Sequence, residues 1–150
     1  MKIKIAFVII ASTLLSCTGK MNVSKPSIEG TWQLINGTLI EKGNTTVTDY
    51  TNNISFIKII NDTHFAFLQH DLKKGQDSGA VFVAGGGRYS LSDSSYTEHL
   101  EYCSARNWEG NDFKFAYSIK EDTLIIRGVE KVESEGINRV NIEKYIRVKK

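Results

Sequence analysis

The segment from residue 96 to residue 102 carries the side chains best placed for chemistry. On alternate positions it holds Tyr96, Glu98, Leu100 and Tyr102. A period of two predicts a strand with these four side chains on one face. Because most of them are apolar, the face is expected to point inward, which would bury the Glu98 carboxylate. A buried carboxylate needs a partner or a raised pKa.

Two interpretations of Glu98 follow. The carboxylate could orient a ligand or act as a general acid or base. Alternatively, it could be a structural group that is hydrogen-bonded to Tyr89, Tyr145 or an arginine. The structural interpretation is the favoured one.

The three histidines do not form a metal-binding motif, because no HxH, HExxH or Cys/His cluster is present. His64 lies beside a turn and is expected to bond to it or to pack there. An enzyme using Glu98 and His64 would need both side chains at one cavity. His99 alternates with Glu98 and is expected to point outward, and His70 lies near the opposite end. No Ser-His-Asp or Cys-His set has supporting context, so neither a metal nor an enzyme activity is expected.

Two further features could serve a ligand. Trp108 lies in a polar loop, where an exposed indole is costly unless something covers it. It could fold back over the end of the domain or contact a ligand or partner, and both readings stay open. The run from Gly85 to Gly87 is not followed by a helix or by Lys-Ser/Thr, so it is not a phosphate loop. A bend or bulge is expected there, rather than close approach of a ligand.

Alternation with a period of two also defines the elements that must position these residues. Strands are predicted near 30–40, 53–60, 63–70, 80–91, 94–103, 112–119, 122–130 and 138–148. Short polar turns separate several of them. Eight consecutive antiparallel strands predict an all-β fold, an eight-stranded antiparallel up-and-down β-barrel that can hold one small ligand.

The predicted connections alternate in length. Those at 41–52, 71–79, 104–111 and 131–137 are long, and the three between them are tight turns. In an up-and-down barrel, alternate connections lie at the same end. The long loops are therefore expected to surround a mouth, and the chain is expected to enter at the closed end.

The first 29 residues predict export and anchoring. Lys2 and Lys4 precede an apolar run that is too short to span a bilayer, which is typical of a signal peptide. Residues 14–17 (LLSC) resemble a bacterial lipobox, which implies cleavage before Cys17 and lipidation of its sulfur. The predicted organisation is a signal peptide at 1–16, a tether at 17–29 and a barrel at 30–150.

Charge and cysteine content agree with this organisation. Without Lys2 and Lys4, 17 basic residues face 17 acidic residues, so nucleic-acid binding is not expected. A lipidated Cys17 cannot form a disulfide. Cys103 is then expected to be a small buried thiol. No acidic residue immediately follows Cys17, which by analogy with other lipoproteins implies the outer membrane, facing the periplasm.

A family resemblance enters at Gly30-Thr31-Trp32. This motif, at the start of the first strand, resembles the lipocalin superfamily, in which an arginine near the end of the last strand packs over the tryptophan. Arg147 matches that role, and the resemblance implies a Trp32–Arg147 plug at the closed end. The apolar alternation of residues 140–148 instead favours the opposite face of that strand as the inward one, so its register stays open. Residues 62–67, 85–89 and 96–102 are similar to uncharacterised lipocalin-like lipoproteins of Gram-negative bacteria.

The expected function is that of a binding module: a membrane-anchored barrel holding a small apolar or amphipathic ligand without a cofactor. The expected ligand contacts are Tyr89, Tyr96, Glu98, Tyr102, Trp108, Phe115 and Tyr117. The alternative is a filled barrel whose loops bind another envelope protein. A cavity above about 300 Å³ that opens between the long loops would favour the binding module.

Overall fold

The computed structural model describes residues 26–92 and 94–149. The predicted signal peptide and Cys17 lie outside the described residues. The strands are β1 Gly30–Glu41, β2 Asn44–Asp49, β3 Ile54–Ile60, β4 His64–Asp71, β5 Phe82–Leu91, β6 Ser95–Cys103, β7 Asp112–Lys120, β8 Thr123–Val132 and β9 Ile137–Arg147. Two short 3₁₀ helices, η1 Arg106–Trp108 and η2 Glu133–Glu135, lie in the connections.

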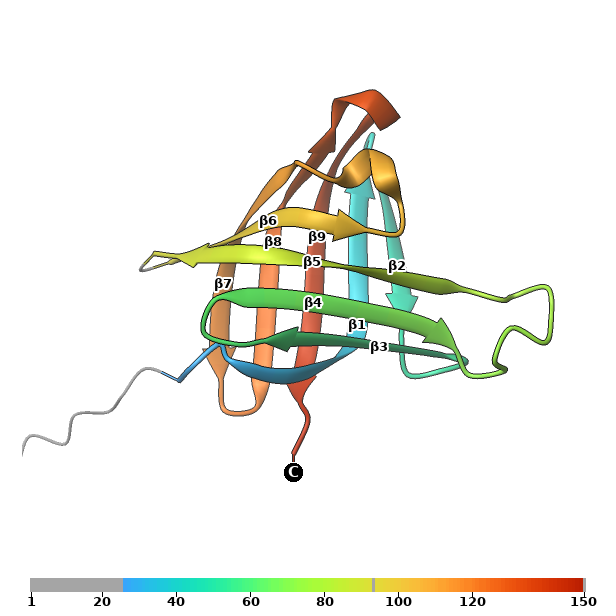
Figure 1. The fold of residues 1–150 in the computed structure, drawn as a ribbon, viewed down its shortest axis with the longest axis horizontal. Coiled ribbons are helices and arrows are strands. Elements are labelled where there is room, and N and C mark those ends of the chain that lie inside the picture. Colours follow the sequence, from blue (N-terminus) through green and yellow to red (C-terminus); the bar gives the residue numbers. More distant parts are fainter. Residues whose placement is uncertain (1–25, 93, 150) are drawn as a thin grey trace, which may run out of the picture.

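The fold is a closed eight-stranded antiparallel barrel with one additional strand. Strands β3 to β9 pair with their neighbours in sequence, and β1 pairs with both β9 and β3, which closes the barrel. Figure 1 shows β3–β6 running across β7–β9 and β1, so the two groups form crossed walls around the core. The predicted all-β class and the eight strands of the barrel are confirmed, and every predicted boundary of these eight strands lies within two residues of the observed one.

The additional strand, β2, occupies much of the predicted loop 41–52. Its β-branched residues Thr45 to Thr48 favour a strand, and Lys42 and Gly43 have the positive φ angles of a tight hairpin turn. Strand β2 pairs with the second half of β1, whereas β3 pairs only with the first four residues of β1. Strands β1 and β3 therefore separate toward the end of the barrel that carries the long loops.

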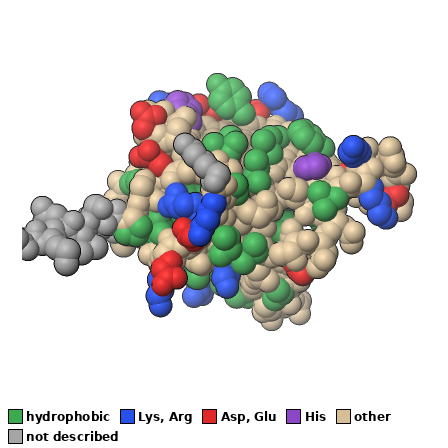
Figure 2. Space-filling view, turned by 90° about the horizontal axis from the view of Figure 1, so that it is seen from below, with side chains coloured by type: hydrophobic (Ala, Val, Ile, Leu, Met, Phe, Trp, Pro, Cys, Tyr) green, Lys and Arg blue, Asp and Glu red, His purple; other side chains and the backbone are tan. Residues whose placement is uncertain are grey.

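The opposite end is closed by Trp32 and Arg147. Trp32 is fully buried, and its indole nitrogen donates a hydrogen bond to the carbonyl of Ile28 (2.8 Å). The Arg147 guanidinium lies 4.0 Å from the centre of the indole ring and donates to the carbonyls of Glu29 and Ser27. Gly30 has a φ angle of +141°, which other residues rarely adopt, and a Cβ there would lie 2.5 Å from the guanidinium. Figure 2 shows this end from below, with hydrophobic and charged side chains mixed on its surface.

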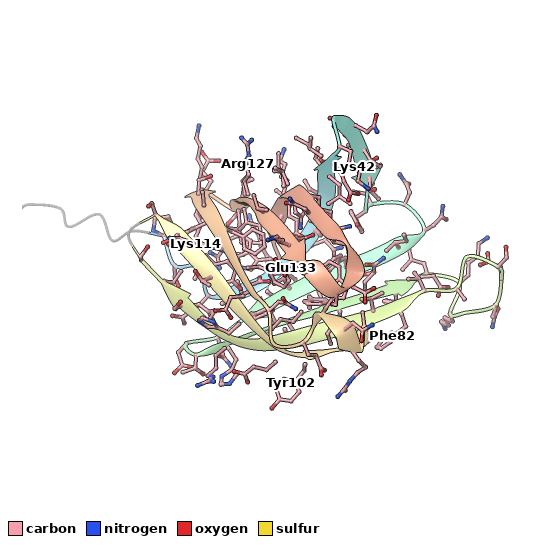
Figure 3. The ribbon with its side chains drawn as sticks, turned by 90° about the horizontal axis from the view of Figure 1, so that it is seen from above. Lys42, Phe82, Tyr102, Lys114, Arg127 and Glu133 are labelled. Atoms are coloured by element: carbon pink, nitrogen blue, oxygen red, sulfur yellow. The ribbon has the colours of Figure 1, made fainter. Side chains whose placement is uncertain are left out.

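The expectation that Tyr102 faces inward is wrong. The β5–β6 pairing skips a residue: Gly87 lies opposite Leu100 and Gly86 opposite Tyr102, which leaves Glu101 as the extra residue of a bulge. The alternation of side chains reverses there. Tyr102 is 68% exposed and points away from the barrel (Figure 3), while Cys103 is buried. The bulge therefore lies in β6, opposite the glycine run of β5, where a Cβ at Gly87 would lie 2.0 Å from the His99 carbonyl oxygen.

The inward face of β9 is the one that its apolar alternation argued against. Arg139, Asn141, Glu143 and Tyr145 point into the barrel, and Tyr145 is fully buried. Ile146 and Val148 are exposed instead. The polar groups on the inward face have partners inside the barrel, so hydropathy alone assigns this strand the wrong way round.

Candidate functional site

The candidate site is a cavity of about 340 Å³ inside the barrel. Its wall includes Thr48 in β2 and Tyr50 just after it, Gln69 near the end of β4, and Ala105 and Trp108 in the β6–β7 connection. All of these lie toward the end that carries the long loops. Trp32, Ile60 and Leu124 fill the other end. The cavity therefore occupies the part of the barrel nearest the predicted mouth, which is the end viewed in Figure 3.

Aromatic rings form much of the cavity wall, namely Tyr50, Phe56, Phe67, Trp108, Phe113 and Phe115. The ring centres of Tyr50 and Phe56 are 5.7 Å apart, and those of Trp108 and Phe113 are 5.8 Å apart. Leu34, Leu39, Val83 and Leu100 add aliphatic surface. This wall offers a large apolar contact area in well-defined positions, as small-molecule sites do.

A chain of polar groups crosses the cavity on its inner side. The Lys58 ammonium lies 2.6 Å from Glu98 Oε1 and 3.5 Å from Glu143 Oε2. The Tyr145 hydroxyl donates to Glu143 Oε2 (2.6 Å). Lys58, Glu98 and Tyr145 are buried, so these groups interact in a poorly hydrated environment where charge pairs are strong and unpaired charges costly.

The polar chain continues toward the mouth. The Asn141 amide donates to Glu143 Oε1 (3.2 Å) and to Glu130 Oε1 (2.6 Å). The Arg139 guanidinium pairs with Glu130 Oε2 (2.7 Å) and lies 5.4 Å from the centre of the Trp108 ring. Trp108 is thus folded back over the barrel, half-buried, and also lines the cavity.

The pKa values reflect an excess of acidic groups. Burial opposes the charge on Lys58, but the carboxylates of Glu98 and Glu143 outweigh burial and raise the pKa of the lysine. Burial raises the pKa of Glu98. The nearby Lys58 only partly offsets this rise, and the negative charge of Glu143 adds to it. Burial and the charge of Glu143 raise the pKa of Tyr145, which therefore stays a neutral donor. One lysine does not fully compensate two carboxylates.

Tyr96 lies behind the cavity, fully buried and in ring contact with Phe65, Tyr89 and Phe115. Its hydroxyl makes no well-formed hydrogen bond to any residue of 26–92 or 94–149, although the Glu98 carboxylate lies close enough to affect its pKa. Burial, together with the charge of Glu98, raises the pKa of this phenol. A buried hydroxyl without a partner is rare in folded proteins and marks a polar position that is not fully satisfied.

The residues expected to contact a ligand fall into four groups. Glu98, Trp108 and Phe115 line the cavity. Tyr89 and Tyr117 are half-buried and pack on the core outside the cavity wall, where the Tyr89 hydroxyl donates to the carbonyl of Asn61 at the closed end. Tyr96 supports the wall from behind, and Tyr102 lies on the outer surface.

The partners of Glu98 differ from those expected from the sequence. Neither Tyr89 nor Tyr145 nor an arginine holds the carboxylate; Lys58 does. Lys58 alternates with Phe56 and Ile60 along β3, and this period of two would have placed the lysine on the inward face. Glu143 and Asn141 share the inward face of β9 with Tyr145 and could have been found from the same register.

The histidines lie away from this network. His64 is exposed and bonded to Thr63 Oγ1, so it does not share a cavity with Glu98. His99 points outward as expected. Its Nε2 lies 3.3 Å from Ser90 Oγ and its Nδ1 2.8 Å from Asp112 Oδ1. This set could relay a proton, but Ser90 is exposed on the outer face and lies outside the cavity wall, so nothing in the cavity presents a substrate to it.

The described residues contain neither a cluster of metal ligands nor a membrane-spanning helix. Within residues 26–92 and 94–149, no group of three or more His, Cys, Asp or Glu side chains is arranged to hold a metal ion. No helix in the same ranges has the length and apolar character needed to cross a membrane. Cys103 is a free, buried thiol on the cavity wall, in keeping with the expectation for this residue.

Comparison with known proteins places the chain in a family defined by sequence. No curated protein matches it. The closed eight-stranded barrel fits a lipocalin-like fold. The family model described as a domain of unknown function, DUF4488, matches residues 27–150, which include all nine strands. The chain therefore belongs to the DUF4488 family.

Proposed function

We propose that this protein is a binding module that holds one small amphipathic molecule inside its barrel. The observation that carries the proposal is the cavity of about 340 Å³ lying toward the long loops. That volume is within the range of small-molecule sites. A barrel packed solid by its aromatic residues, which the filled-barrel alternative requires, would not contain it.

The lining supports an amphipathic ligand. Phe56, Phe67 and Phe115 would contact the apolar part of the ligand. Asn141 and Glu143 lie at the polar side and would bond to its head group. Trp108, held against Arg139 and Phe113, would cover the bound molecule near the mouth. Burial of the apolar part supplies affinity, and the few polar groups fix its orientation.

Native mass spectrometry tests this proposal. The protein is purified from its native envelope as the wild type and as Ala105→Trp, which places an indole at the rim of the cavity. Val129→Trp is the matched control, because Val129 is 53% exposed on the outer face of β8. The wild type and the control should carry an adduct that is lost on denaturation, and Ala105→Trp should carry less of it. Absence of an adduct from the wild type would favour the filled barrel.

We also propose that the protein is anchored to the outer membrane, facing the periplasm, through a lipid on Cys17. The proposal rests on residues 14–17, which resemble a lipobox. Ile28 and Glu29 contact the closed end through Trp32 and Arg147, so an anchor that precedes them would leave the mouth facing away from the membrane. Labelled palmitate should be incorporated into the wild type in a Gram-negative host and not into Cys17→Ser. Equal labelling of both would refute the anchor site.

A second candidate function is binding of an envelope protein on the outer face. Two aromatic side chains there are unusually exposed, Phe82 at 69% and Tyr102 at 68%. Large exposed apolar side chains often mark protein contacts. Crosslinking in intact envelopes should yield a specific adduct that is lost in Phe82→Ser and Tyr102→Ser. Retention of that adduct in both variants would exclude this face.

A further inference from the structure

We infer that the molecule held in the barrel is an amphipathic amine, bound as its ammonium form beside Glu143. The inference rests on the proposed function and specifies its ligand class. It starts from the charged groups that line the cavity: three carboxylates, Glu98, Glu130 and Glu143, and two cations, Lys58 and Arg139. The lining therefore has one more carboxylate than it has cations.

Pairing distances identify the uncompensated carboxylate. Lys58 is bonded to Glu98 at 2.6 Å, and Arg139 is bonded to Glu130 at 2.7 Å. Glu143 lies 3.5 Å from Lys58, and its closer contacts in the described part of the chain are neutral: the Tyr145 hydroxyl at 2.6 Å and the Asn141 amide at 3.2 Å. Glu143 thus lines the cavity without a cation of its own.

An ammonium group is the ligand feature that completes this arrangement. An incompletely paired carboxylate in a poorly hydrated site is costly, and a bound cation removes that cost. A ligand carboxylate would add a fourth negative charge, while both cations already have close partners. The favoured head group is therefore positive, and an anionic one is disfavoured.

The barrel already holds one ammonium in this way. The Lys58 Nζ contacts two carboxylates and lies 5.4 to 6.0 Å from the ring centres of Phe65, Tyr96 and Tyr145. Ring faces attract cations, and the attraction is stronger where water is excluded. The rings of Phe56, Phe67 and Phe115 offer similar surface on the cavity wall. A ligand ammonium beside Glu143 would meet a similar combination of carboxylate and rings.

The test uses the full chain and three probes that share an indole-ethyl frame and differ in head group: tryptamine, tryptophol and indole-3-propionate. Isothermal titration calorimetry at pH 7 should show tryptamine binding at least about ten-fold more tightly than tryptophol. Indole-3-propionate should bind most weakly. This ranking is measured on the wild type, so it does not depend on any variant folding.

Glu143→Gln then tests the assigned residue, because it removes the charge and keeps a polar group of the same size. It should weaken tryptamine binding at least about ten-fold and tryptophol binding by much less, because a glutamine side chain can still hydrogen-bond to a hydroxyl but cannot pair with an ammonium. Glu133→Gln is the matched control, since Glu133 is exposed in η2 and pairs with Lys131. The control should bind all three probes as the wild type does.

Failure of the amine assignment can be distinguished from failure of the proposed function. Tighter or equal binding of tryptophol or indole-3-propionate, or no binding of tryptamine, would overturn the amine assignment. A neutral fluorescent naphthylamine dye is titrated in parallel. If the dye binds and tryptamine does not, the barrel is a binding module for another class of ligand. If neither binds, the proposed function fails as well. Retained tryptamine binding in Glu143→Gln would overturn the role of Glu143.

Discussion

At the scale of single residues, Lys58 organises the interior of this barrel. It is buried, it contacts Glu98 and Glu143, and three aromatic rings surround its ammonium. Because it is the only one of these charged groups that is positive, its removal leaves two carboxylates without a cation nearby. The acidic partners are less critical individually, since either can be neutralised while the other still pairs with Lys58.

The first prediction follows from this asymmetry. Lys58→Met should lower the free energy of unfolding at pH 7 by about 3–5 kcal/mol, because it removes the one cation that pairs with the two carboxylates. Glu98→Gln should change it by less than about 1 kcal/mol, since Glu143 remains to pair with the lysine. Urea unfolding measures both. Lys114→Met, on the exposed face of β7, is the control and should be neutral. Equal losses in Lys58→Met and Glu98→Gln would contradict the asymmetry.

The second prediction concerns pH. Burial raises the pKa of Glu98 above its ordinary value of 4.5, so the folded state binds this proton more tightly than the unfolded chain. The stabilisation is present at low pH and is lost as the pH rises through the folded-state pKa. The free energy of unfolding of the wild type minus that of Glu98→Gln should therefore fall as the pH rises above 4.5. Urea unfolding of both proteins across that range is the measurement. A difference that rises with pH would mean that Lys58 lowers the pKa instead.

The sequence predicted the buried Glu98 but not its partner. The period of two placed Glu98 inside, and that placement follows from its apolar neighbours. Lys58 lies among four isoleucines in residues 54–60, and its neighbours other than Ser55 are apolar. This composition predicts a buried strand but gives no sign of a buried charge. The acidic group that Lys58 contacts depends on how β3 and β6 face each other across the barrel. The residues next to Lys58 in the sequence do not determine that arrangement.

At the scale of elements, two irregularities account for most of the differences from expectation. Hydrophobic alternation predicted eight strands because the barrel has one buried and one exposed face along most of each strand. It could not anticipate the bulge at Glu101, which reverses the alternation and turns Tyr102 outward. It also failed on β9, where the inward face is polar. Alternation shows that a strand has two faces, and the partners across the barrel decide which one is buried.

The third prediction concerns Arg147, which connects two segments of the chain at the closed end. Arg147 joins the end of β9 to the segment before β1 through two carbonyl hydrogen bonds and its contact with Trp32. Arg147→Met should lower the free energy of unfolding by about 2 kcal/mol. Arg147→Lys keeps the charge but loses the planar fork, and an intermediate loss is expected. Arg127→Met, on the exposed face of β8, is the control (Figure 3). Thermal unfolding provides the comparison, and a neutral Arg147→Met would show that the plug contributes nothing to stability.

At the scale of the whole molecule, the barrel is divided along its axis. Trp32, Arg147 and the core residues around Tyr96 fill the closed end, while the cavity and its polar chain occupy the end with the long loops. The alternating connection lengths predicted this division, because alternate loops of an up-and-down barrel share an end. The β2 hairpin, which lies in the longest predicted loop, separates β1 from β3 near the mouth. The same connection that looked like a loop in the sequence therefore shapes the opening.

The central claim is that the cavity near the long loops takes up a small molecule. Titration of the neutral fluorescent naphthylamine dye into the wild type, Ala105→Trp and Val129→Trp tests it most directly. We predict saturable binding of one dye per chain to the wild type and to Val129→Trp, and much weaker binding to Ala105→Trp. No saturable binding to the wild type, or binding unaffected by Ala105→Trp, would contradict the claim.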